Sequence, residues 1–216
     1  FRASKEALDD EQEEVVSDAA RALGSSLNYT YEVDHMNLFN NGFTSEQSPD
    51  GVSIFNAAHA LKGGGSARNQ LATVSDLSWT SLQTALTDWQ RETKFEAGQI
   101  MLPVEDLILY VPPELEFTAA KIVNSTLQPG VGDNDLNTIR TLRNITVVKN
   151  VYLTDTDAWF LLAGNKSHGF CSYTRVPMSM EPAMTDPRTR NRLYPIRFRQ
   201  SWGVKFWQQS FGTAGA

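Results

Sequence analysis

Residues 4–42, SKEALDDEQEEVVSDAARALGSSLNYTYEVDHMNLFNNG, form the longest stretch of this chain that is typical of one continuous helix. Its apolar residues recur at helical spacing and therefore share one face: Val16, Ala20, Leu23, Leu27, Tyr31 and Leu38. Asn40, Asn41 and Gly42 provide a stop signal. A helix of this length would span roughly 50 Å, so we expect a strut rather than a core helix. Two shorter helices separated at Gly24 are the alternative, because glycine inside a helix costs about 1 kcal/mol relative to alanine.

The two ends of the chain differ in charge. The opening turns of the expected helix are acidic, which suits the positive end of the helix dipole, and Asp10 with Glu13 has the spacing of a capping box. Beyond Phe170 the bias is basic, with seven Arg and Lys residues against Glu181 and Asp186. Such ends can pair within one subunit or between neighbouring copies, although two solvated faces are the simpler interpretation of any single pair.

Composition places the chain among ordinary globular proteins. Of its 216 residues, 41% are hydrophobic and 20% are charged, with a formal net charge of −6. No apolar run is long enough to cross a bilayer, so we expect no membrane partner. The chain begins with Phe1 rather than Met, and we therefore expect a segment upstream of it. Cys171 is the only cysteine, which excludes an intrachain disulfide and predicts a reduced, partly buried thiol.

Residues 43–75 are rich in Gly, Ser, Asn and Asp and contain SPDGVSIFNAAHALKGGGSARNQL. A connection of this length is usually structured or functional. We expect a structured excursion, because several of its apolar residues can pack down: Val52, Ile54, Phe55, Ala57, Ala58 and Leu61. The glycines at 63–65 lack the Lys-Ser/Thr pair and the preceding strand of a phosphate-binding loop, so we interpret them as a flexible tip.

The remaining chain mixes helices and strands without a regular cycle, which indicates an α+β fold. We expect a helix from the N-cap Ser78 to a point before Gly98, and another opening at residues 112–113. In the latter, four residues are expected to face inward: Leu115, Phe117, Ile122 and Val123. Residues 127–142 are turn-rich and predict a surface loop. Apolar runs predict strands at residues 100–102, 106–111, 144–149, 158–163 and 170–176. Residues 194–199 alternate with a period of two, which predicts a half-buried strand, and Pro195 favours an edge position for it.

The residues that could carry chemistry form no recognisable site. His35, His59 and His168 have no second ligand at metal spacing, so we expect neither a metal nor another cofactor. Ser53, His59 and Asp157 could be drawn as a hydrolytic triad, but no nucleophile-elbow pattern accompanies them. We therefore predict no catalytic residue and keep a small hydrolase as a weak alternative.

A basic strip near the C-terminal end suggests another alternative. Arginines at 188, 190, 192, 197 and 199 are interleaved with aromatic residues, and this resembles a face that binds single-stranded nucleic acid. Aromatic residues at alternating strand positions are more often core or interface, and the whole chain is acidic. A nucleic-acid-binding module therefore remains a second weak alternative.

Several segments follow one another in a characteristic order. The acidic start and the long helix end in LFNNGF, and SPDGVSIFNAAHAL, a glycine-rich turn and RNQL come next. SLQTALTDWQ, LPVEDLILYVPPELEFTAAKIVNS and DAWFLLA complete the series, which extends from about Asp9 to Gly203. In this order and spacing the chain resembles the major capsid proteins of tailed bacteriophages, in particular the Mu-like head-subunit branch.

The resemblance implies the Hong Kong 97-type capsid fold, an α+β fold with a long spine helix, a peripheral domain and an axial domain. By this analogy, residues 1–105 form the peripheral domain with the spine helix at 4–42 and the excursion at 43–75. Residues 106–170 form the axial domain, and residues 171–216 are strands that return to the periphery. Such proteins normally carry an N-terminal arm and an extended loop before the spine, and the sequence departs from this pattern because neither precedes Phe1 in it.

The resemblance also implies a function without an active site. It indicates a structural major capsid protein, located in the virion and assembled in the host cytoplasm, whose pentamers and hexamers form an icosahedral shell. The shell would enclose double-stranded DNA without sequence-specific contact. Further implied partners are scaffold, portal, maturation protease and decoration proteins. The shell protein of a non-viral compartment with the same fold is the nearest alternative.

Two sets of residues are candidate contacts in such a shell. Interfaces there must tolerate small rotations, which charged contacts allow better than interdigitated cores. The first set contains candidate inter-subunit contacts: Asp10, Glu11, Glu13, Glu14, Arg188, Arg190, Arg197 and Arg199. The second set lies in a mobile polar tip predicted to project toward the capsomer axis: Gly130, Gly132, Asp133, Asn134 and Asp135.

Overall fold

The chain forms two compact units, each built from two separated segments. Unit 1 comprises residues 1–35 and 172–202, and unit 2 comprises residues 36–171 and 203–216. The division differs from the expected boundary at residue 105, because residues 36–105 group with the segment that follows them. The computed structural model describes residues 1–10, 13–95, 97–98, 106–130, 135–164 and 168–216.

Two helices stand where one was predicted over residues 4–42. Helix α1 (Lys5–Asp9) begins after Ser4, whose side chain accepts a hydrogen bond from the amide of Ala7, and it ends at the cap Asp10. Helix α2 (Glu13–Asn40) has 28 residues and continues through Gly24. The prediction of a single helix was wrong at its acidic start, where aspartate competes for backbone hydrogen bonds and favours caps over helix interiors.

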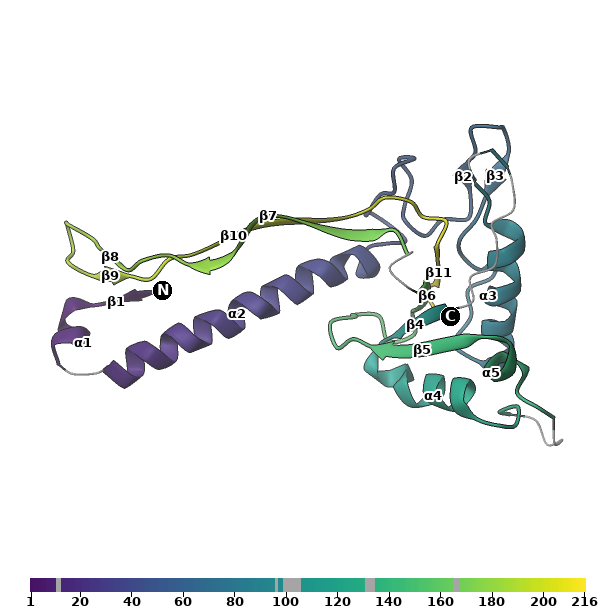
Figure 1. Ribbon diagram of the computed structural model, residues 1–216, viewed down its shortest axis with the longest axis horizontal. Coiled ribbons are helices and arrows are strands. Elements are labelled where there is room, and N and C mark those ends of the chain that lie inside the picture. The colour runs from purple at the N-terminus through teal and green to yellow at the C-terminus, as the bar shows by residue number, and fades with distance from the viewer. Residues whose placement is uncertain (11–12, 96, 99–105, 131–134, 165–167) are drawn as a thin grey trace. The chain divides into compact units, whose positions relative to one another are not determined.

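Helix α2 contributes to both units (Figure 1). Its apolar face in unit 1 includes the half-buried Leu23, Leu27 and Tyr31. The segment in unit 2 buries Met36, Leu38 and Phe39 almost completely. The helix ends at Asn40 as expected, whereas the side chains of Val16 and Ala20 lie outside the described part of the chain.

Long strands dominate the C-terminal half of unit 1. Strands β7 (Phe170–Met180) and β10 (Ile196–Val204) pair as a two-stranded ribbon (Figure 1). Strands β1 (Arg2–Ala3), β9 (Arg192–Leu193) and β8 (Met184–Thr185) form an antiparallel sheet in the order β1-β9-β8. Along β10, Ile196 and Phe198 are half-buried while Arg197 and Arg199 are exposed, which confirms the predicted alternation. Cys171 is a free, partly buried thiol, also as predicted.

Unit 2 contains a four-stranded sheet in the order β11-β6-β4-β5. Strand β4 (Asp106–Val111) lies parallel to β5 (Asn144–Lys149) and antiparallel to β6 (Trp159–Ala163), and β6 is buried along its whole length. These strands confirm three predictions, whereas residues 100–102 lie outside the described residues. Strand β11 (Ser210–Thr213) pairs with β6 and buries Phe211, so the last strand of residues 171–216 belongs to this sheet.

Helices pack against this sheet. Helix α3 (Trp79–Glu92) begins at the predicted N-cap Ser78 and contributes Leu82, Leu86 and Trp89 to the core. The 3-10 turn η1 (Pro113–Leu115) leads into α4 (Glu116–Asn124), whose Ile122 and Val123 are buried as predicted.

Two expectations about this part of unit 2 were wrong. Phe117 is 81% exposed, because it lies two positions before the buried Ala119 and hence on the opposite side of α4. Helix α5 (Thr138–Leu142) occupies part of the expected surface loop, because Ile139 packs into the core.

An aromatic cluster joins the end of α2 to the sheet within unit 2. The Phe39 ring lies 5.3 Å from Tyr110, 5.2 Å from Phe160 and 4.7 Å from Phe170, measured between centroids. Phe55 of the excursion lies 5.0 Å from Phe160. The cluster therefore connects α2, the excursion, β4, β6 and β7.

Residues 43–75 form a structured excursion, as predicted. Ile54 and Phe55 are buried, although Ala57 and Ala58 are exposed, contrary to the expectation that they pack down. Strands β2 (His59–Ala60) and β3 (Ser66–Ala67) pair across the glycine tip. At this tip Gly64 and Gly65 have φ of 90° and 83°, a conformation that favours glycine.

Candidate assembly surfaces

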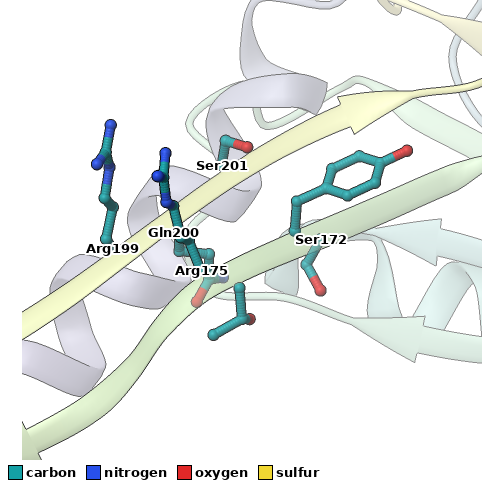
Figure 2. Close-up of a pocket in the computed structure, with 7 residues that line it drawn as sticks. Ser172, Arg175, Arg199, Gln200 and Ser201 are labelled. Atoms are coloured by element: carbon teal, nitrogen blue, oxygen red, sulfur yellow. The ribbon is translucent and has the colours of Figure 1, made fainter.

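One face of the β7–β10 ribbon carries a basic groove of about 530 Å³. It is lined by residues 172–175 and 199–201, among which there are two arginines and no acid. Figure 2 shows Arg175 on β7 and Arg199 on β10. Two exposed guanidinium groups without a carboxylate beside them favour an anionic partner. Arg199 was among the predicted contacts, but Arg175 was missed because it stands alone in its segment of sequence.

Aromatic contacts hold the ribbon to α2 inside unit 1. The Trp202 ring stacks on His35 at 4.5 Å and meets Tyr31 edge-on at 4.9 Å. Tyr194 stacks on Phe1 at 5.4 Å. These aromatic faces are therefore occupied by the chain's own rings, which argues against a platform for stacking nucleic-acid bases.

The predicted basic contacts are exposed and lie at two places in unit 1. Arg197 and Arg199 project from β10, and Arg197 approaches Glu181 at 3.9 Å. Arg188 and Arg190 lie in the turn between β8 and β9. The structure thus presents the four arginines on one strand and one turn.

The predicted acidic contacts are only partly described. Asp10 caps the end of α1 and is exposed, and Glu14 is exposed in the first turn of α2. Glu11 and the side chain of Glu13 lie outside the described residues. The ion pairs recorded near these acids are local to the helices, between Lys5 and Asp9 at 3.7 Å and between Arg21 and Asp18 at 3.1 Å.

Hydrogen bonds anchor the base of the predicted axis tip. Leu127 and Leu136 form an antiparallel bridge, and the amide of Gln128 donates to the carbonyl of Asp135 at 2.9 Å. Asn137 is buried beside the bridge and donates to the carbonyl of Ile122 at 2.6 Å.

At the tip itself, Gly130 has φ of 86° and is exposed, as is Asp135. Gly132, Asp133 and Asn134 lie outside the described residues. The direction in which the tip projects within a capsomer stays a prediction.

His59 takes part in a structural network rather than the imagined triad. Its Nδ1 lies 2.7 Å from Asp50 Oδ2, and its Nε2 lies 3.0 Å from Asn69 Oδ1. Ser53 instead donates its hydroxyl to the carbonyl of Phe55, and Asp157 accepts from its neighbour Thr156. The side chain of His59 is completely buried, so no substrate can reach it.

The carboxylate of Asp50 is held in its charged form. Burial opposes the charge, but hydrogen bonds from Ser48 and His59, together with attraction to the His59 ring, lower the pKa of Asp50 below its ordinary value. The network joins Asp50, His59 and Asn69, which lie at separate positions in the excursion. The spacing of these residues in the sequence therefore did not predict their contact.

Two further site types find no support in the described residues. No group of three or more His, Cys, Asp or Glu side chains there is arranged to hold a metal ion. Among the same residues, no helix has both the length and the apolar character that a bilayer crossing demands.

Comparison with known proteins decides the family. The sequence profile described as "Phage capsid protein" matches residues 1–209. The chain belongs to the phage capsid protein family. No curated protein sequence matches it. As a phage capsid protein the chain has a structural role in the shell of a virion, and it is not an enzyme.

Solved structures agree with the fold. The capsid of Myoviridae phage XM1 is 13% identical with a TM-score of 0.54, and the match covers 100% of this chain and 71% of that one. A structure from Mycobacterium phage Che8 is 12% identical with a TM-score of 0.53, covering 100% and 70%. The capsid of cyanophage P-SCSP1u is 12% identical with a TM-score of 0.52, covering 93% and 65%. These likenesses confirm the α+β capsid fold of the Hong Kong 97 type.

Proposed function

We propose that this phage capsid protein assembles into pentamers and hexamers that close an icosahedral shell around packaged double-stranded DNA. The observation that carries the proposal is the family match over residues 1–209. The net charge of −6 suits a shell that encloses DNA without gripping it, because neutralising phosphates requires clustered Lys and Arg. Assembly takes place in the host cytoplasm, with scaffold, portal, maturation protease and decoration proteins as partners.

The two units suit different places in a capsomer. Residues 106–170 supply β4, β5, β6, α4 and α5, and we assign them to the axial domain, with the tip around Gly130 and Asp135 pointing toward the capsomer axis. The helix α2 and the ribbon β7–β10 belong to the peripheral domain. This assignment is supported by the anchored base of the tip and by the exposed charges of unit 1.

Charged contacts between neighbouring copies give the shell its tolerance to different local geometries. Arg188, Arg190, Arg197 and Arg199 are exposed, and the acidic start of α1 and α2 offers the opposite charge. An exposed ion pair stabilises by only about 0.2–1 kcal/mol, but a closed shell repeats each pair in every copy.

Particle formation tests the proposal directly. The purified chain is concentrated and examined by sedimentation velocity and negative-stain electron microscopy. We expect ring-shaped capsomers or closed particles of uniform size. A chain that stays a monomer or dimer at every concentration and salt condition would contradict self-assembly.

A non-viral shell is the second candidate. A virus-like particle from Pyrococcus furiosus is 10% identical with a TM-score of 0.50, and the match covers 99% of this chain and 72% of that one. The contents of particles from the native source separate the two candidates. Nuclease-resistant DNA of genome length supports the phage head, whereas particles filled with protein support the compartment.

A further inference from the structure

Arg190 adopts a backbone conformation that its residue type disfavours. Its φ is 61°, and among the residues that the structure describes it is the one non-glycine with positive φ. The Cβ atom makes this left-handed region unfavourable for most residues, whereas glycine and asparagine enter it readily. A strained residue at a surface turn is a reason to ask what its side chain does.

The turn that holds Arg190 is tightly organised. The Asp186 carboxylate accepts hydrogen bonds from the amide of Arg188 at 2.9 Å and from the hydroxyl of Thr189 at 2.7 Å. The carbonyl of Asp186 accepts from the amide of Arg190 at 2.8 Å, and its amide donates to the carbonyl of Asn191 at 2.9 Å. The hydrogen bonds from the Thr189 hydroxyl and the Arg188 amide lower the pKa of Asp186, so the carboxylate stays charged and keeps the turn closed.

The two arginines of this turn face solvent. Arg188 and Arg190 are exposed, and neither forms an ion pair with a described residue of the chain. Asp186, the nearest acid in sequence, is occupied by the turn itself. The turn therefore fixes the backbone of two arginines, and their side chains have no ion pair with the described residues.

We propose that residues 186–191 form a preformed arginine clamp that binds carboxylates of the α1 segment in a second copy of this chain. The proposal rests on the proposed function, because it needs copies that associate. A turn that is already ordered loses little backbone freedom on binding, and a guanidinium group can grip a carboxylate through two hydrogen bonds.

The charge distribution points to α1 as the acceptor. Some acids elsewhere pair within the chain, with Asp88 and Glu92 near Arg68 and Glu116 near Lys149, and the exposed acids without a described ion pair, such as Glu114 and Asp155, are scattered. Within α1 and its cap, three acids lie in five residues and are all exposed: Glu6, Asp9 and Asp10. Among the described residues, Lys5 forms an ion pair with Asp9. The α1 segment thus keeps excess negative charge on the surface of every copy.

Substitutions at Arg190 separate the clamp from the stability of the turn. Arg190→Asn removes the guanidinium and suits the left-handed backbone, so we expect an unchanged or higher subunit melting temperature and an association constant lower by about tenfold. Arg190→Lys keeps the positive charge but loses the two-pronged guanidinium group, so we expect the association constant to fall by less than in Arg190→Asn.

The matched control Arg91→Ala removes an exposed arginine from unit 2 and should change the association constant by less than about twofold. A lower melting temperature for Arg190→Asn would overturn the clamp, because the side chain would then serve the turn itself.

A mixing experiment tests whether the contact joins two copies. Subunits with Arg188→Glu and Arg190→Glu, and subunits with Glu6→Lys, Asp9→Lys and Asp10→Lys, should each associate poorly. Mixing the two should restore association, because the exchanged charges meet between copies. Failure to restore it would overturn the assignment of α1 as the acceptor.

The remaining outcomes distinguish this clamp from the shell function. If the unmodified chain forms no particles, the proposed function fails. If it forms particles and Arg190→Asn forms them equally well, only the clamp fails. A labelled 30-base-pair DNA duplex is the probe for the competing partner. Weaker, less salt-dependent DNA binding by Arg190→Asn, with normal particle yield, would assign the turn to phosphate instead.

Discussion

His59 stacks on Trp207 with ring centroids 3.8 Å apart and ring planes 7° apart. Asn69 donates its amide to the carbonyls of Ile54 and Trp207, which turns its oxygen toward His59 Nε2, while Asp50 faces Nδ1. Asp50 and Asn69 therefore hold the two ring nitrogens of His59, and the indole of Trp207 covers one face of the ring. This arrangement connects the excursion to the segment that follows β10.

The network predicts that replacing His59 lowers the free energy of unfolding. His59→Ala would remove one hydrogen-bond partner from the buried Asn69 oxygen and one from the Asp50 carboxylate, and it would open a cavity beside Trp207. We therefore expect the free energy of unfolding to fall by about 3 kcal/mol. Chemical denaturation of dissociated subunits measures it. The controls Ser53→Ala and Asp157→Asn should lower the free energy of unfolding much less. None of the three variants should change the background rate at which the protein hydrolyses a test ester. Loss of a real turnover in His59→Ala with assembly intact would contradict the structural interpretation.

Acid should weaken the same network. The folded pKa of Asp50 lies below its ordinary value of 3.8, so the unfolded chain binds more protons between the two values. The contribution of Asp50 is complete above about pH 3.8 and is lost as the pH falls through the lower folded pKa. Asp50→Asn should therefore reduce unfolding free energy at neutral pH and flatten its dependence on pH below 4. An equally steep acid dependence in the variant would assign the effect to other carboxylates.

Two glycines near α2 should respond in opposite directions. A Cβ atom added to Gly24 meets no atom of the chain within 4 Å, so Gly24→Ala should stabilise the dissociated subunit by about 0.5–1 kcal/mol. A Cβ atom added to Gly42 would lie 2.7 Å from the Leu38 carbonyl oxygen and 2.9 Å from Phe55, so Gly42→Ala should destabilise it by about 1–3 kcal/mol. Thermal unfolding of both variants checks this. A stabilised Gly24→Ala that no longer assembles would indicate another copy packed closely at that position.

Local patterns predicted the elements that local physics determines. Ser78 marked the start of α3, and the apolar run at 106–111 coincides with β4, because capping and continuous hydrophobicity act over a few residues. The end of α2 at Asn40 followed from the same kind of signal. Family resemblance, carried by the order of segments, supplied the capsid fold.

Contacts between distant residues could not be predicted in this way. Asn69 reaches the carbonyl of Trp207 across 138 positions. Strand β11 joins β6, although the capsid analogy assigned residues 171–216 to the periphery. The left-handed backbone of Arg190 also escaped prediction, because it has no sequence signal of its own. In each case tertiary packing, not local propensity, selects the partner.

The charges of β10 should stabilise assembly more than they stabilise the subunit. Arg197 and Arg199 are exposed, and the only ion pair described for them joins Arg197 to a partly exposed Glu181. Reversing both to glutamate should leave the subunit melting temperature nearly unchanged, because an exposed pair contributes about 0.2–1 kcal/mol. The same change should block particle formation, where the contact recurs in every copy.

High salt should weaken the contacts between copies of the unmodified chain, because the Debye length falls to about 3 Å at 1 M. As the salt concentration rises, capsomers should therefore separate before their subunits unfold. Reversal of Glu13 and Glu14 to lysine in the same chain should restore part of the yield if these acids meet the arginines of a neighbour. Particle yield by sedimentation and melting temperature by circular dichroism, measured on the same samples, give the comparison. If the particle yield and the melting temperature fell together, these arginines would belong to an ordinary contact within one chain.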